Sequence, residues 1–170
     1  ANGSALVSHP CHHRGERWQD SGNASVAWQG TSDPAACAAA VRQLLHLEYE
    51  CFMAPCAVAG VHMPRVSGPF FAFDAFFFVA HGLGLVEWDA VKNLTRSDLA
   101  AAATSFCLLD IAEARRRADE PWKYGKHLCA AGQLVVELLS AYGFEEDFPI
   151  TFGRKVNGKS ADWTLGAMLY

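Results

Sequence analysis

The chain has 170 residues, of which 51% are hydrophobic and 19% charged, and its formal net charge is −4 at pH 7. This composition is typical of one folded domain, or of one lobe of a larger protein, and excludes an intrinsically disordered chain. The one run of three basic residues is Arg115–Arg117. Nucleic acid is therefore not expected as a partner.

Cysteine and asparagine patterns indicate an oxidising compartment. The chain has six cysteines, an even number, and three Asn-x-Ser/Thr sequons that begin at Asn2, Asn23 and Asn93. Disulfides and N-glycans both belong to proteins of the secretory pathway. We therefore expect a secreted or extracellular protein, or one in the secretory-pathway lumen, with glycosylation at these asparagines. Because Ala1 begins without a signal peptide, we interpret the chain as a mature protein or a piece of one.

The first chemically suggestive segment is Ser8–Gly15 (S-H-P-C-H-H-R-G), which follows a short strand-like run at residues 5–7. Zinc needs three or four ligands at converging spacings, and no C-x2-C or H-x3-H pair follows. A Cys/His nucleophilic pair needs a thiolate, which an oxidised cysteine does not provide. We therefore expect Cys11 to form a disulfide and regard Arg14 as the candidate functional residue.

Residues 17–47 predict a hairpin and then a helix. Short strands around Trp18 and Trp28 flank a run of turn residues, which is the pattern of a hairpin. Asp33-Pro34 is a helix start, with the aspartate as N-cap and the proline at the first helical position. The helix is expected to end at about Leu47.

The next segment contains a small loop between Cys51 and Cys56. Its two thiols are close enough in sequence to bond to each other, and a redox C-x-x-C motif would have a different spacing. A structural bridge is therefore favoured. Residues 57–63 predict a strand, and residues 64–68 predict a turn.

The most apolar segment is Phe70–Leu85, which holds six of the eleven phenylalanines. Pro69 before it, and Gly82 and Gly84 near its end, predict one helix across the segment. Such a helix is apolar almost all round, so we expect it at the centre of the core, and it is too short to span a bilayer. We also expect one phenylalanine to offer its ring to a ligand.

The second half of the chain is mostly helical by pattern. Thr95 and Asp98 form a capping box, and apolar residues recur at three- and four-residue steps before Gly143. The predicted elements are helices at residues 95–107, 108–117, 126–142 and 161–170, and a strand at residues 150–156 followed by an Asn157-Gly158 turn. The fold class is therefore α/β, with more helix than strand.

Motifs that would identify a reaction are absent from the sequence. There is no Walker loop, no dinucleotide fingerprint and no nucleophile elbow. The carboxylates are scattered, and no pair of them lies in a turn suited to a metal ion or to acid–base catalysis. Residue chemistry alone predicts a secreted α/β domain.

Seven motifs nevertheless follow one another in a recognisable order. They are Ser8-His9-Pro10-Cys11 with Arg14-Gly15, Gly30-Thr31-Ser32 with Cys37, Cys51 with Cys56, Gly60-Val61 with Pro64, residues 68–78, Cys107 with Cys129, and Asp162-Trp163-Thr164-Leu165-Gly166 with Met168-Leu169. In this order they resemble the C-terminal part of the ecto-nucleoside triphosphate diphosphohydrolases, the apyrase family. The last motif resembles the family's fifth conserved region, and the resemblance covers nearly the whole chain.

The resemblance implies an α/β fold that is the helix-rich C-terminal lobe portion of an actin-like (ribonuclease-H-like), two-lobed enzyme. The family hydrolyses nucleoside tri- and diphosphates to monophosphates, with Ca²⁺ or Mg²⁺ on the phosphates and a glutamate that orients or deprotonates water. Its phosphate loops, that glutamate and its metal-anchoring aspartates lie upstream of the position matching Ser8. We therefore expect residues 1–170 to bind the nucleoside and to need the N-terminal lobe, from the same precursor or a second chain, for catalysis.

Residues at the nucleoside end follow from the same resemblance. Arg14 matches an arginine near the base and ribose, and Phe77 matches a tyrosine that stacks on the base. The opposing tyrosine of the family is replaced by Leu128, which weakens the usual aromatic sandwich. Tyr124 or Lys123 is a candidate substitute from the same loop, so we expect loose base selectivity.

Covalent and packing expectations also follow from the resemblance. Six cysteines allow fifteen connectivities, and the family pattern selects Cys11–Cys37, Cys51–Cys56 and Cys107–Cys129. Trp163 is expected to pack the last helix against the core. Two other interpretations remain: a secreted nucleotide-binding module without catalysis, and a purely structural disulfide domain.

Overall fold

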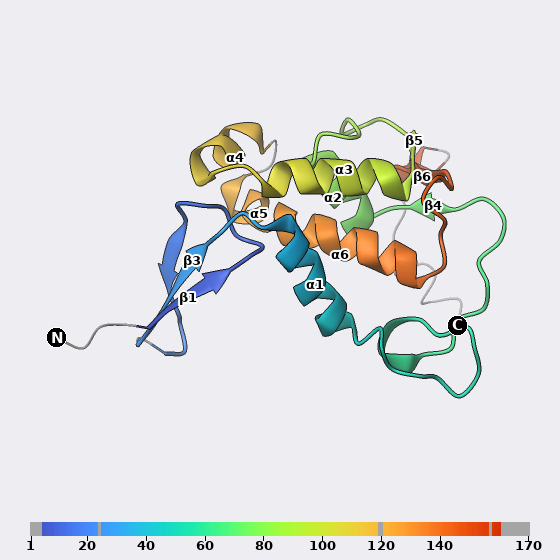
Figure 1. Ribbon diagram of the computed structural model, residues 1–170. Coiled ribbons are helices and arrows are strands. Elements are labelled where there is room, and N and C mark those ends of the chain that lie inside the picture. The colour runs from blue at the N-terminus through green and yellow to red at the C-terminus, as the bar shows by residue number, and fades with distance from the viewer. Residues whose placement is uncertain (1–4, 24, 119–120, 157, 161–170) are drawn as a thin grey trace.

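The computed structural model describes residues 5–23, 25–118, 121–156 and 158–160, which form helices and three small sheets (Figure 1). The helices are α1 (Pro34–Leu45), the 3-10 turn η1 (Val58–Gly60), α2 (Ala75–Gly82), α3 (Arg96–Cys107), α4 (Ile111–Arg117), α5 (Trp122–Gly125) and α6 (Leu128–Ala141). The strands are β1 (Ala5–His9), β2 (Arg17–Gln19), β3 (Val26–Gly30), β4 (Phe71–Ala72), β5 (Lys92–Leu94), β6 (Ile150–Phe152), β7 (Lys155–Val156) and β8 (Lys159–Ser160). The mixed α/β class is therefore confirmed.

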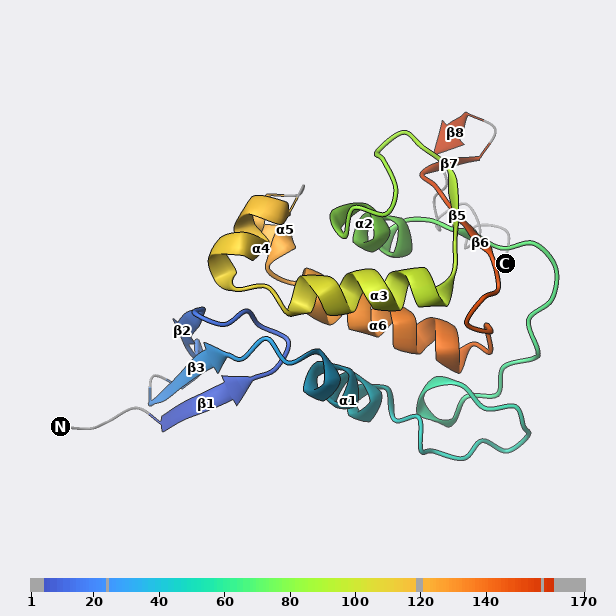
Figure 2. The ribbon, with the colours of Figure 1, turned by 45° about the horizontal axis from the view of Figure 1, so that its top comes forward.

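The N-terminal sheet has the order β1-β3-β2 and lies at one end of the molecule (Figure 2). β2 and β3 run antiparallel with Trp18 opposite Trp28, so the predicted hairpin is confirmed. β1 runs parallel to β3. The segment after β1 contacts the helical part, where the Ile111 N–H donates to the Arg14 carbonyl over 3.1 Å.

The helical part is organised around α6, which lies between α3 and α1 and packs against both (Figure 2). A Cβ on Gly132 of α6 would lie 2.7 Å from the Cβ of Ala103 of α3, so only glycine permits this close approach. The main core contains Phe77, Leu99 and Phe152, each at most 1% exposed. A second core cluster surrounds Phe106 and two of the disulfides.

The phenylalanine-rich segment is not one helix, which corrects the prediction for Phe70–Leu85. Its first part, β4, pairs with β6 in a parallel register that places Phe71 opposite Thr151. Asp74 then has a φ of 50°, outside the helical range, and α2 begins only at Ala75. An apolar run of this length suits a buried strand as well as a buried helix, so the pattern did not separate the two.

The sequence predicts the starts of helices that have polar caps more accurately than it predicts the apolar segment Phe70–Leu85. The Ala36 N–H donates to the Asp33 side chain at the start of α1, and both bonds of the Thr95/Asp98 capping box are present at α3. The strand predicted at residues 57–63 is wrong: it contains η1, in which Ala59 has a φ of 52°. The helix predicted at residues 161–170, with Trp163, lies outside the described residues.

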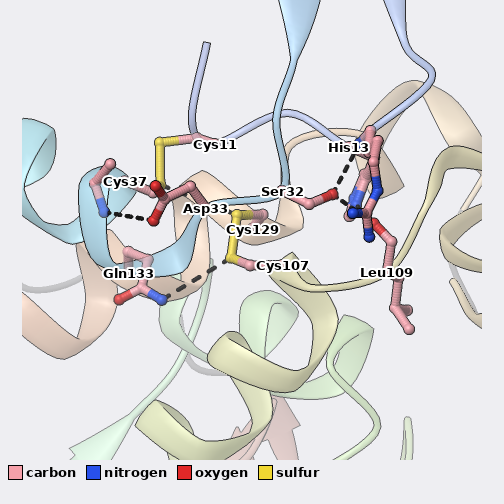
Figure 3. Close-up of a disulfide and its surroundings, with 11 residues drawn as sticks. Cys11, His13, Ser32, Asp33, Cys37, Cys107, Leu109, Cys129 and Gln133 are labelled. Atoms are coloured by element: carbon pink, nitrogen blue, oxygen red, sulfur yellow. Dashed lines mark hydrogen bonds between the residues drawn. A yellow bond between two sulfur atoms is a disulfide. The ribbon is translucent and has the colours of Figure 1, made fainter. Parts of the chain in front are cut away.

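Three disulfides form, Cys11–Cys37, Cys51–Cys56 and Cys107–Cys129, which confirms the expected pairing. Two of them pack together, because the sulfur atoms of Cys37 and Cys129 are 4.0 Å apart (Figure 3). Together these two bridges attach the N-terminal segment to α1 and the end of α3 to the start of α6. Among the described helices, none is long and apolar enough to cross a membrane.

Candidate functional site

A cavity of about 480 Å³ lies between the middle of α2, helix α5 and the start of α6. It is lined by Phe78, Val79, Trp88, Tyr124, His127, Leu128 and Ala131. Three of these side chains are aromatic and partly open to solvent: Phe78 is 41% exposed, Trp88 43% and Tyr124 56%. A cavity of this size and chemistry suits a small, flat, largely apolar group.

The start of α6 is held in place by covalent and steric constraints. The Cys107–Cys129 bridge fixes Cys129, and the preceding residue Leu128 is buried with its side chain against α2. A Cβ on Gly82 would lie 2.7 Å from a methyl carbon of Leu128, so the leucine side chain packs directly against the backbone of α2 at this glycine. The disulfide and this packing together fix the position of Leu128 in the cavity wall.

A second cavity, of about 340 Å³, lies along the phenylalanine-rich segment. Its described lining consists of aromatic and aliphatic side chains with Asp74 as the one charged group. It offers no second polar side chain, apart from the Tyr142 hydroxyl, to orient a ligand. The first cavity is therefore the better candidate site.

Phe77, the residue expected to stack on a base, does not reach the cavity. Its side chain is 0% exposed and belongs to the main core, where its ring lies parallel to that of His81 at 6.0 Å between centroids. The expectation that Phe77 offers a ring face to a ligand is therefore wrong. The next residue, Phe78, is turned by about 100° on the helix and lines the cavity instead.

Tyr124 and Leu128 both line the cavity, as neighbours across the α5–α6 junction. Lys123, the other candidate of that loop, lies with its ammonium nitrogen 4.6 Å from the centre of the Tyr124 ring. The cation therefore lies beside the ring that faces the cavity. His127, also in the lining, was not expected from sequence because its neighbours carry no recognisable motif.

Arg14 lies outside the lining of this cavity. Its backbone is fixed, since its N–H donates to the Ser32 hydroxyl over 2.8 Å and its carbonyl accepts from Ile111. Its side chain is exposed, with no ion pair to any described residue. The structure does not bring Arg14 together with Tyr124 and Leu128 in one pocket.

A histidine cluster joins the N-terminal sheet to the helical part. The His12 ring lies 4.2 Å from that of Trp18, 4.6 Å from that of His9 and 6.5 Å from that of His127, and its Nδ1 is 2.9 Å from Glu16. The next residue, His13, is fully buried and donates from Nδ1 to the Leu109 carbonyl over 3.0 Å (Figure 3). These rings pack the sheet against the helices.

No three potential metal ligands converge anywhere in the described part of the chain, this cluster included. The cluster is therefore a packing and hydrogen-bonding arrangement, and zinc chemistry is not assigned to it. The described residues therefore supply no cluster of three such side chains that could hold Ca²⁺ by themselves.

Acidification is expected to destabilise the fold through two of these histidines. Burial lowers the pKa of His13, and burial followed by the nearby His12 lowers the pKa of His9. Both rings stay neutral in the folded protein at a pH where the unfolded chain, with a histidine pKa of about 6.5, binds protons. The stability they contribute is thus complete above the unfolded pKa of about 6.5 and is lost as the pH falls below it.

Urea unfolding at pH 7.5, 6.5 and 5.5 measures this effect. His13→Asn, which keeps a donor for the Leu109 carbonyl, is expected to flatten the pH dependence. The pKa of Asp20 is lowered chiefly by the hydrogen bond from Trp28, so the stability that this carboxylate contributes is complete above about pH 4 and is lost only at lower pH, outside the range of this experiment. Stability that rises on acidification from pH 7.5 to 5.5 would contradict the prediction.

The described sequon asparagines lie at the surface. Asn23 is in the turn of the β2–β3 hairpin, where its side chain accepts from the Ser25 N–H. Asn93 is in β5, and its side-chain oxygen accepts from the Thr151 hydroxyl over 2.8 Å. Asn2 lies outside the described residues. Glycosylation of these asparagines stays a prediction.

Comparisons with known proteins agree with the motifs. The family model described as the GDA1/CD39 (nucleoside phosphatase) family matches residues 2–170. Ectonucleoside triphosphate diphosphohydrolase 8 of Bos taurus is 30% identical over 202 residues, covering 99% of this chain and 37% of the bovine protein. The human protein of the same name is 31% identical, covering 96% of the chain and 32% of the relative.

Ectonucleoside triphosphate diphosphohydrolase 2 of Gallus gallus is 32% identical over 169 residues, covering 98% of this chain and 33% of the chicken protein. The chain thus spans about a third of the length of these relatives. The residues that line the 480 Å³ cavity lie within this matched part of the family.

Proposed function

Because the chain belongs to the GDA1/CD39 (nucleoside phosphatase) family, we propose that it supplies the base-binding side of the cleft in an enzyme that hydrolyses nucleoside tri- and diphosphates to monophosphates. The named relatives are nucleoside triphosphate diphosphohydrolases and are about three times as long as this chain. In the proposal, the remaining two thirds form the N-terminal lobe of an actin-like, two-lobed fold. That lobe comes from the same precursor or from a second chain.

The observation that supports this role is the aromatic lining of the 480 Å³ cavity. Phe78 and Tyr124 offer partly exposed rings from different helices, and Leu128 closes the wall between them. A nucleobase is a flat π-system that stacks on such rings, at roughly 1–3 kcal/mol per ring. Phe78 thereby takes the role that the family resemblance suggested for Phe77.

The remaining parts of the nucleotide, the ribose and the phosphates, need charged groups and a metal ion. Arg14 is exposed but lies outside the cavity lining, so its contact with the ribose rests on the family resemblance alone, whereas Lys123 beside Tyr124 adds positive charge next to a ring of the cavity. Ca²⁺ or Mg²⁺ neutralises phosphate charge when it binds with the nucleotide. Because no cluster of three metal-ligating side chains is found among the described residues, the proposal assigns that ion and the activation of water to the N-terminal lobe.

Phosphate release from ATP and ADP by the complete protein, with Ca²⁺ or Mg²⁺, tests the proposal. Phe78→Ala and Tyr124→Ala are each expected to raise KM roughly 5- to 100-fold while kcat changes little, because stacking holds substrate and transition state alike. Tyr49→Ala is the matched control, since Tyr49 is an exposed aromatic residue outside both cavities. Unchanged KM in both cavity variants would overturn the base-binding assignment.

The same assay separates the remaining interpretations. A complete protein that binds ATP without releasing phosphate would be a secreted nucleotide-binding module. A protein that neither binds nor hydrolyses nucleotides would be a structural disulfide domain.

An extracellular location, or one in the secretory-pathway lumen, belongs to the same proposal. The three disulfides fit an oxidising compartment, and the relatives carry the prefix ecto in their names. Enzymatic removal of N-glycans from the native protein, followed by mass measurement, tests glycosylation at Asn2, Asn23 and Asn93.

A further inference from the structure

The loop between α2 and β5 contributes one residue to the candidate cavity, Trp88. Nothing in the motif pattern singled out this tryptophan. Its ring lies 5.8 Å from that of Phe78, 5.2 Å from that of His81 and 6.3 Å from that of Phe77, measured between centroids. All three neighbours are on α2, so the indole packs along one helix while 43% of the residue stays exposed.

Two consecutive contacts tie this loop to the segment after β6. The guanidinium carbon of Arg154 lies 4.0 Å from the centre of the Trp88 ring. The next pair along both segments is Asp89 with Lys155, whose charged atoms are 3.4 Å apart. A guanidinium stacked on an indole restrains the plane of the ring as well as its position.

Among the residues that the structure describes, the buried Nη1 of Arg154 has no hydrogen-bond partner. The face of the guanidinium is held by its stacking on Trp88. Arg154 is absent from the cavity lining, so any effect it has on a ligand passes through the indole.

We propose that Trp88 is a specificity-determining residue of this cavity that favours purine over pyrimidine bases, and that Arg154 is its positioning residue. The inference rests on the proposed base-binding function. An indole has the largest stacking face of any side chain in the cavity, and a two-ring purine overlaps it more than a one-ring pyrimidine. Discrimination therefore comes from contact area and not from a hydrogen-bond code.

The test compares ATP with UTP in the complete protein. Trp88→Ala is expected to raise KM for ATP about tenfold and KM for UTP about threefold or less, with kcat nearly unchanged. Trp88→Phe should keep part of the preference and guards against a folding defect. Arg154→Gln should reduce the ATP/UTP preference, and Arg154→Lys should restore part of it, since a cation over the ring is retained.

A binding signal independent of turnover completes the test. ADP added without divalent metal should quench tryptophan fluorescence in the wild type, and the quenching should be lost in Trp88→Phe. Trp18→Phe is the matched control, because Trp18 lies in the N-terminal sheet and is not part of the cavity lining, and it should keep the quenching.

An unaltered ATP/UTP ratio of KM values in Trp88→Ala, with Phe78→Ala and Tyr124→Ala still raising KM, would overturn this inference alone. Unchanged KM in all three variants would overturn the proposed function with it.

Discussion

Replacing Phe77 by alanine is expected to lower the free energy of unfolding by about 3–5 kcal/mol, the usual cost of removing a fully buried phenylalanine. Phe77 has no exposed surface and lies in the main core, so the surrounding side chains can fill only part of the space it leaves. Urea denaturation measures the loss. Phe77→Leu should cost less, because it keeps much of the apolar volume.

Phe78→Ala is the matched control for this variant, since it removes the same side chain from the adjacent position. Because Phe78 is 41% exposed, its loss should cost about 1 kcal/mol or less in stability and should act on nucleotide KM instead. The opposite outcome, with Phe77→Leu raising KM and Phe77→Ala barely destabilising the protein, would return Phe77 to the ligand site.

Replacing Cys107 and Cys129 together by alanine is expected to cost about 3 kcal/mol of stability. The bridge closes a loop with a sequence separation of 22, and the chain-entropy model assigns roughly that value to a loop of this length. Both cysteines are almost fully buried beside the Cys11–Cys37 bridge, so lost packing adds to the effect. KM for nucleotides should also rise, because the bridge fixes the start of α6 and with it Leu128.

The Cys51/Cys56 pair is the internal comparison for this prediction. It closes a loop with a separation of only 5 and lies at the surface, so the double alanine variant should lose about 2 kcal/mol or less and leave KM unchanged. Equal losses from the two pairs, together with an unchanged KM in both, would contradict the role given to the Cys107–Cys129 bridge.

The sequence predicted well those elements that depend on residues close together in the chain. The Asp33 cap and the Thr95/Asp98 capping box each depend on groups three residues apart, so the sequence contains all that is needed to start α1 and α3. The hairpin pairing of Trp18 with Trp28 likewise follows from turn residues between two short strands. The disulfide pairing is different: spacing leaves fifteen possibilities, and the family resemblance selected the pairs that form.

Elements defined by a distant partner were not predictable in this way. Phe71 and Ala72 form a strand because β6, nearly eighty residues later, supplies its hydrogen-bonding edge. The cavity combines α2, the Trp88 loop, α5 and α6, and no spacing along the chain brings these segments together.

The sequence by itself determined the α/β class, the capped helices and, through its motifs, the family and the disulfide pairs. Only the tertiary structure decided that Phe78 and not Phe77 faces the cavity, and that Trp88 and His127 join Tyr124 and Leu128 there. The physical reason is that α2 is apolar on every side, so its residues carry no pattern that marks the buried face. The packing of α2 against α6 and β6 determines which face of α2 is buried.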